Sequence, residues 1–119
     1  MAGGIYAISG ANAVGPSHAF AGAPAAAVGT SCVTPSIAVT IPNTLLIFSC
    51  AVPSTTGRSV TEPPEMTGNE RWDRESNGTY IVTSESAYES LAAPAMVSRT
   101  GTVSGSEYNV GFLLAVAPR

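Results

Sequence analysis

The stretch that decides the fold is TLLIFSCAV, residues Thr44–Val52. Its β-branched and aromatic side chains favour an extended strand, and the preceding pair Pro42-Asn43 suits the centre of a tight turn. The run Leu45–Phe48 is apolar at every position, so both faces of this strand are apolar there. The run Phe112–Val116 makes a second strand apolar on both faces. In a two-layer sandwich, the outer face of a strand normally alternates with polar residues. We therefore expect something further to cover the outer face of both strands.

Other short runs rich in β-branched or aromatic residues are bounded by Gly, Pro, Asn and Ser: Ile5–Ser9, Val33–Ile41, Thr79–Ser84, Val97–Ser104 and Tyr108–Ala117. Strands at this spacing predict one all-β domain over residues 1–119, an antiparallel β-sandwich with jelly-roll character.

Several local signals refine this prediction. Asn77-Gly78 indicates a two-residue type I′ turn between strands at Trp72–Ser76 and Thr79–Thr83. Gly105 is expected to turn the chain between the last two strands. The segment Ser84–Ala93 fits either a short helix ended by Pro94 or an irregular strand.

Charge is sparse and unevenly distributed. Only 11% of the 119 residues are charged, there is no Lys, and a single His is present. An acidic chain without a basic patch is a poor candidate for nucleic-acid binding. Residues 1–57 contain no Asp, Glu, Lys or Arg, so we expect this half to form a subunit interface and residues 58–119 to face solvent.

The two cysteines, Cys32 and Cys50, are too few for a disulfide framework and lack C-x-x-C spacing. If Pro42-Asn43 closes a two-residue hairpin, Cys50 lies opposite Pro35, and Cys32 is roughly 10 Å further along. That separation exceeds the roughly 7 Å limit between the Cα atoms of a disulfide. We therefore expect two unbridged thiols, with a single bridge as the alternative.

Few residues are candidates for chemistry. His18 has no acid within 40 residues in sequence, so a surface or interface position is favoured over a triad with Asp73. Glu70, Asp73 and Asn77 could converge on a cation, but their spacing departs from that of a calcium loop. We therefore expect no enzyme activity, no cofactor and no metal. We interpret the charged residues 58–77 as a solvated loop and edge strand.

Trp72, the only tryptophan, lies within this charged segment. Period-2 alternation favours an inward, core-packed indole with Arg71 and Asp73 pointing outward. An interface anchor is a second possibility, and a glycan or partner contact formed by Trp72 with Arg71, Asp73 and Tyr80 is a third. The sequon Asn77-Gly78-Thr79 is better explained by the turn.

No targeting signal is recognised. Met1–Gly10 lacks the positive residues of a secretory leader. The longest apolar run, Leu45–Val52, is far shorter than the roughly 20 residues of a membrane-spanning helix.

The runs Pro63–Thr67, Arg71–Asp73, Arg99–Ser104 and Phe112–Pro118 resemble the C-terminal half of a β-sandwich domain. That domain recurs in actinobacterial surface proteins and in structural proteins of the phages that infect such bacteria. Ile5–Gly10 resembles its middle strand and Val33–Val52 the following hairpin, so the resemblance covers residues 4–118. Family members carry further strands before the segment that matches Ile5. The resemblance implies a noncatalytic role.

The function expected from these observations is that of a virion structural protein, a capsid decoration or tail or fibre component assembled in the host cytoplasm. We expect a homo-oligomer, with a trimer favoured, that contacts major capsid or tail proteins. The expected contact residues are Ile5, Tyr6, Ala7, Ile8, Ile37 and Val39. The alternatives are a carbohydrate-binding module centred on Trp72 and a bacterial surface or filament subunit.

Overall fold

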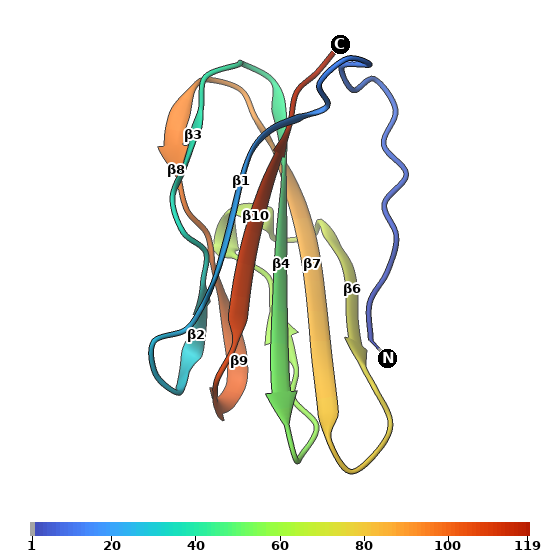
Figure 1. Cartoon of the computed structure of the whole chain (residues 1–119), viewed down its shortest axis with the longest axis vertical. Coiled ribbons are helices and arrows are strands. Elements are labelled where there is room, and N and C mark those ends of the chain that lie inside the picture. The colour runs from blue at the N-terminus through green and yellow to red at the C-terminus, as the bar shows by residue number, and fades with distance from the viewer. Residues whose placement is uncertain (1) are drawn as a thin grey trace.

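The computed structural model describes residues 2–119 and confirms an antiparallel β-sandwich (Figure 1). One layer is a five-stranded sheet in the order β1-β10-β4-β7-β6, and the other contains the sheets β2-β9-β5 and β3-β8. The strands are β1 (Ser17–Pro24), β2 (Gly29–Val33), β3 (Ile37–Val39), β4 (Thr44–Ser54), β5 (Val60–Thr61), β6 (Glu70–Glu75), β7 (Ile81–Leu91), β8 (Ala95–Val97), β9 (Thr100–Glu107) and β10 (Val110–Val116). A short 3-10 helix, η1 (Pro64–Met66), lies between β5 and β6 in sequence.

In the second layer, the pairing of β2 with β9 continues into the pairing of β3 with β8. Beyond the last pair of β2 and β9, the backbone N–H of Thr34 donates to the carbonyl of Arg99 at 2.9 Å. The N–H of Arg99 in turn donates to Oγ1 of Thr34 at 2.8 Å. These two bonds carry the pairing of β2 with β9 across the break into the pairing of β3 with β8.

The core lies between the two layers. Alternate residues of β4 point inward, and Leu46, Phe48 and Val52 are fully buried. The facing layer and η1 contribute Cys32, Ile37, Val39, Val60, Met66, Val97 and Val103. Gly101 lies directly against the Phe48 ring, where a Cβ atom would be 2.8 Å from Cζ. Close approach of the layers at this point therefore requires glycine.

The cysteines are bridged, so the expectation of two unbridged thiols is wrong. Cys32 and Cys50 form a disulfide with their Cα atoms 6.3 Å apart. The expected turn at Pro42-Asn43 is present, with Asn43 at a φ of 58°. However, this turn does not close a hairpin, because β3 pairs with β8 whereas β4 pairs with β10 and β7. The turn instead carries the chain from one layer to the other, which places β2 across the core from β4.

Several local predictions also change. The hairpin between β6 and β7 is present, but Ser76 donates its N–H to the carbonyl of Val82, so the connecting loop is longer than a two-residue type I′ turn. Gly105 lies inside β9. Residues 84–91 belong to β7, so the helical alternative is wrong.

The beginning of the chain also differs from expectation. Ile5–Ser9 has no regular secondary structure, whereas β1, which lacks a strong strand signal in sequence, pairs along its length with β10. Jelly-roll character stays a prediction. The strands divide into sheets of five, three and two strands, with β6 joined to β7 in the largest. The two halves of the sequence interleave, since β4 lies between β10 and β7.

Candidate interaction surface

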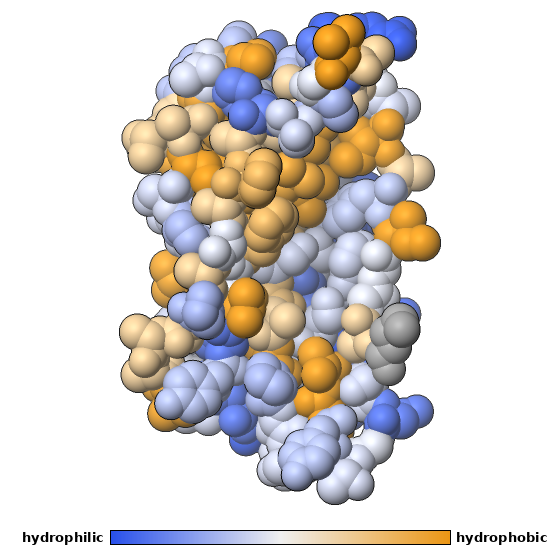
Figure 2. All heavy atoms as spheres, viewed as in Figure 1, coloured by the Kyte–Doolittle hydropathy of each residue, from blue (hydrophilic) through white to orange (hydrophobic). Residues whose placement is uncertain are grey.

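The outer face of the five-stranded sheet carries an apolar cluster over β1 and β10. Its centre is formed by Phe20 and Phe112, whose ring centroids are 6.4 Å apart. The Phe20 side chain is 66% exposed and that of Phe112 37% exposed. Figure 2 shows hydrophobic side chains gathered on this face, which Figure 1 views from the side of β1, β10 and β4. β1, β10 and the nearby β2 contain no charged residue.

The cover expected over the apolar strands is only partial. Ile47 is nearly buried because Leu114 and Tyr88 stand beside it on the neighbouring strands. Towards the end of the sheet, the segment before β1 approaches Leu45, and Ile8 lines a shallow hollow of about 260 Å³ with it. The cluster over β1 and β10 stays open to solvent.

The expected contact residues fall into two groups. Ile5, Ala7 and Ile8 are exposed and accessible to another molecule. Ile37 and Val39 point into the core with 5% and 2% exposure. Their assignment to a subunit interface is therefore wrong, because their side chains are already covered by the rest of the chain.

Tyr6 is anchored within its own chain. Its ring packs against Trp72 with centroids 5.1 Å apart, and its hydroxyl forms a 2.9 Å hydrogen bond with the hydroxyl of Ser86. Gly4 lies so close to the indole that a Cβ atom would be 2.5 Å from Cε3. The segment before β1 thus covers Trp72.

Trp72 faces outward, contrary to the favoured core position. A β-bulge between Glu70 and Trp72 shifts the register of β6, so that Trp72 lies opposite Ser86 and Asp73 opposite Glu85. Asp73 consequently points into the sandwich, where its carboxylate accepts the N–H of Val60 at 3.3 Å. The extra residue of the bulge inverts the alternation that period 2 predicts.

The proposed glycan contact does not form one surface. Arg71 stacks on the Tyr88 ring at 4.4 Å, and Asp73 faces the interior. Tyr80 is 80% exposed in the loop between β6 and β7. Trp72 donates its indole N–H to Ser84 at 3.3 Å and is covered on one side by Tyr6.

The interior holds a buried carboxyl group, that of Glu85, which sequence reasoning missed. Glu85 is fully buried, and within residues 2–119 neither carboxyl oxygen has a hydrogen-bond partner. Burial raises the pKa of Glu85 to about 8, and the carboxylates of Glu70, Asp73 and Glu62 add to the rise. Burial also raises the pKa of Asp73. The only sign of the burial of Glu85 in the sequence is its position two residues from both Thr83 and Ala87, which face the interior from β7.

The three residues considered as possible cation ligands are not brought together. Glu70 and Asp73 lie on β6, whereas Asn77 lies in the exposed loop beyond it. Across the described residues 2–119, no group of three or more His, Cys, Asp or Glu side chains could hold a metal ion.

His18 links two strands. Its Nε2 atom accepts the backbone N–H of Thr40 at 3.0 Å and lies 3.1 Å from the Thr40 hydroxyl oxygen. Asp73, its suggested triad partner, is on β6 at the opposite edge of the sheet from β1. The imidazole thus ties the start of β1 to the chain just after β3.

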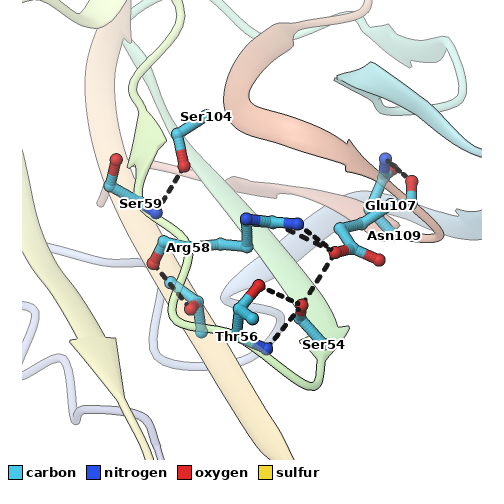
Figure 3. A network of polar contacts seen from close by, with 8 residues as sticks. Ser54, Thr56, Arg58, Ser59, Ser104, Glu107 and Asn109 are labelled. Carbon is cyan, nitrogen blue, oxygen red and sulfur yellow. Dashed lines mark hydrogen bonds and ion pairs between the residues drawn. The ribbon is translucent and has the colours of Figure 1, made fainter.

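A polar network lies where β4, β5 and β9 approach one another (Figure 3). Glu107 accepts two hydrogen bonds from Arg58, at 2.7 and 3.0 Å, and one from Ser54 at 2.7 Å. The bonds from Ser54 and Arg58 lower the pKa of Glu107. Nearby, Ser104 accepts the N–H of Ser59 at 3.0 Å. The network joins residues about fifty positions apart, so no local motif could reveal it.

No helix within residues 2–119 has the length and apolarity to cross a membrane. Comparison of the chain with protein-family models, with curated proteins and with solved structures finds no significant match.

Proposed function

We propose that this protein is a noncatalytic structural subunit of a virion, a capsid decoration or tail component that acts by assembly with copies of itself and with other virion proteins. The observation that carries the proposal is the uncharged apolar cluster around Phe20 and Phe112, open to solvent on the outer face of the sheet. Burying apolar surface contributes roughly 25 cal/mol per Å². A side chain such as that of Phe20 therefore favours association over exposure to water.

The disulfide fits a protein that works outside the cytoplasm, on a particle or on a cell surface. Cys32 and Cys50 are 0% and 1% exposed, so their bridge forms part of the core. Disulfides persist in oxidising surroundings, which include the surfaces of particles outside the cell.

Mass spectrometry of purified particles tests the proposal. We expect the protein in particles at a copy number comparable to that of other structural proteins, and its gene among head or tail genes. Recovery from the bacterial envelope instead of from particles would identify a surface or filament subunit, which would use the same contacts. Absence from both fractions would contradict an assembly role.

A further inference from the structure

The two edges of the five-stranded sheet are protected differently. β6 has the sequence ERWDRE, with charge at all but one position, and a bulge interrupts its pairing. Such features prevent an edge strand from pairing with another chain. β1 has the sequence SHAFAGAP, with no Lys, Arg, Asp or Glu. Its own bulge lies between Ser17 and Ala19, and the remainder pairs regularly with β10.

The hydrogen-bonding groups of β1 show which part of this edge is free. The N–H of Ala25 donates to the carbonyl of Asn109 at 2.8 Å, which fixes the phase of the ladder with β10. Hydrogen-bonded and non-bonded pairs alternate in an antiparallel ladder. The N–H and C=O groups of Phe20 and Gly22 therefore point away from β10, and both residues are exposed.

We propose that β1 pairs antiparallel with β1 of a second copy of this chain, about a twofold axis that passes at Ala21. This inference rests on the proposed assembly function and specifies one of its contacts. In this register, Phe20 of each copy lies opposite Gly22 of the other, and both residues use their free N–H and C=O groups. A register centred on Gly22 would instead place Phe20 opposite Pro24, which has no N–H to donate.

Three features favour a second copy as the partner. An antiparallel strand is complementary to itself, so one segment supplies both sides of a twofold contact. β1 and its neighbours β2 and β10 are uncharged, so two chains of net charge −3 meet without close repulsion. The Phe112 ring also lies over Gly22, with Cδ2 2.7 Å from the position of a Cβ atom. Phe20 of the second copy would pack beside that ring and continue the apolar cluster across the joint.

Sedimentation of the full-length chain with two substitutions at one position tests the pairing. The wild type should sediment at about 24 kDa, twice the 12.0 kDa of one chain. Phe20→Ala removes the ring but keeps the N–H, and should weaken dimerisation by about tenfold. Phe20→Pro removes both the ring and the N–H and should give a monomer. The variant should still fold, since proline is tolerated at an edge where the N–H faces outward. Tyr80→Ala, which removes another exposed aromatic ring, should leave the dimer intact.

Circular dichroism of each variant identifies loss of folding, and amide exchange in the wild type gives a second measurement. Dilution below the dissociation constant should accelerate exchange at Phe20 and Gly22. A trimer, or a dimer that persists in Phe20→Pro, would overturn the edge pairing and leave the proposed function standing. A dimer of the expected behaviour that is absent from particles would uphold the pairing and contradict the proposed function. A wild-type monomer at micromolar concentration, with rapid exchange at both amides, would also overturn the pairing.

Discussion

Cys32 of β2 and Cys50 of β4 crosslink the two layers of the sandwich through the centre of its core, with their Cα atoms 6.3 Å apart. The cysteines are 18 positions apart in sequence, and the loop that they close contains β3 and the turn at Pro42-Asn43. The bridge therefore closes the loop within which the chain changes layers.

Replacing both cysteines with alanine should lower the free energy of unfolding by about 3 kcal/mol, because the unfolded chain loses a loop constraint. Urea denaturation of the oxidised wild type and of the double variant measures this difference. The wild type measured with reductant is the matched control and should lie close to the variant. An intact mass equal to that of the dithiol, in protein kept from reductant, would contradict the bridge.

Buried Glu85 should make stability fall as the pH rises. In the folded chain, burial raises the pKa of its carboxyl from 4.5 to about 8, so the native state retains a proton that the unfolded state releases. The stability that this pKa shift contributes is complete below pH 4.5. It is lost as the pH rises from 4.5 towards 8, by up to roughly 1.4 kcal/mol per pH unit. Urea denaturation at several pH values between 4.5 and 8 measures how steeply the free energy of unfolding falls with pH.

Glu85→Gln keeps the shape of the neutral acid and should flatten this dependence, giving a variant more stable than the wild type at the upper end of the range. Glu65→Gln, at an exposed position in η1, is the control and should keep the wild-type profile. A wild type whose unfolding free energy stays constant across the range would show that Glu85 is ionised in the folded chain.

Removing the Tyr6 side chain should release the segment that covers Trp72. Tyr6→Ala deletes both the ring packed at 5.1 Å and the hydroxyl bonded to Ser86. We expect a red shift of the fluorescence of the single tryptophan and a loss of about 1–2 kcal/mol of stability. Ile5→Ala, at a side chain that is 95% exposed, should change neither. An unchanged emission spectrum in Tyr6→Ala would show that the segment does not cover the indole in solution.

A methyl group at Gly111 should destabilise the sandwich. A Cβ atom there would lie 2.6 Å from the carbonyl oxygen of Val33, and that backbone belongs to the facing layer. Gly111→Ala should therefore cost about 1–3 kcal/mol, as overpacking generally does. Gly29→Ala, where a Cβ atom meets nothing within 4 Å, is the matched control. Equal thermal midpoints for the two variants would contradict the close approach of β2 and β10.

Local patterns predicted the fold class and several elements. The β-branched and aromatic residues of β4 and β10 indicate strands wherever they lie, because that preference belongs to the side chains themselves. The positive φ at Asn43 likewise follows from the residue type. The sequence did not predict β1, because Ala and Gly carry little strand preference. The extended conformation of β1 depends on its pairing with β10.

The orientation of side chains in β6 could not be predicted from local alternation. One extra residue in the bulge at Arg71 moves Trp72 to the outer face and Asp73 to the inner face. Whether a strand bulges depends on its partner, β7, and the sequence of β6 alone does not specify that pairing.

By itself, the sequence determined that the chain forms an all-β domain and that β1, β2 and β10 carry no charge, because both follow from residue type and position. The tertiary structure decided that the two cysteines meet, which apolar residues stay exposed, and that Glu85 is enclosed without a hydrogen-bond partner among the described residues. These features depend on pairing between segments far apart in the chain. The turn at Pro42-Asn43 shows the difference clearly: its backbone conformation is local, whereas its role as a hairpin or a crossing between layers depends on the strands to which its two arms pair.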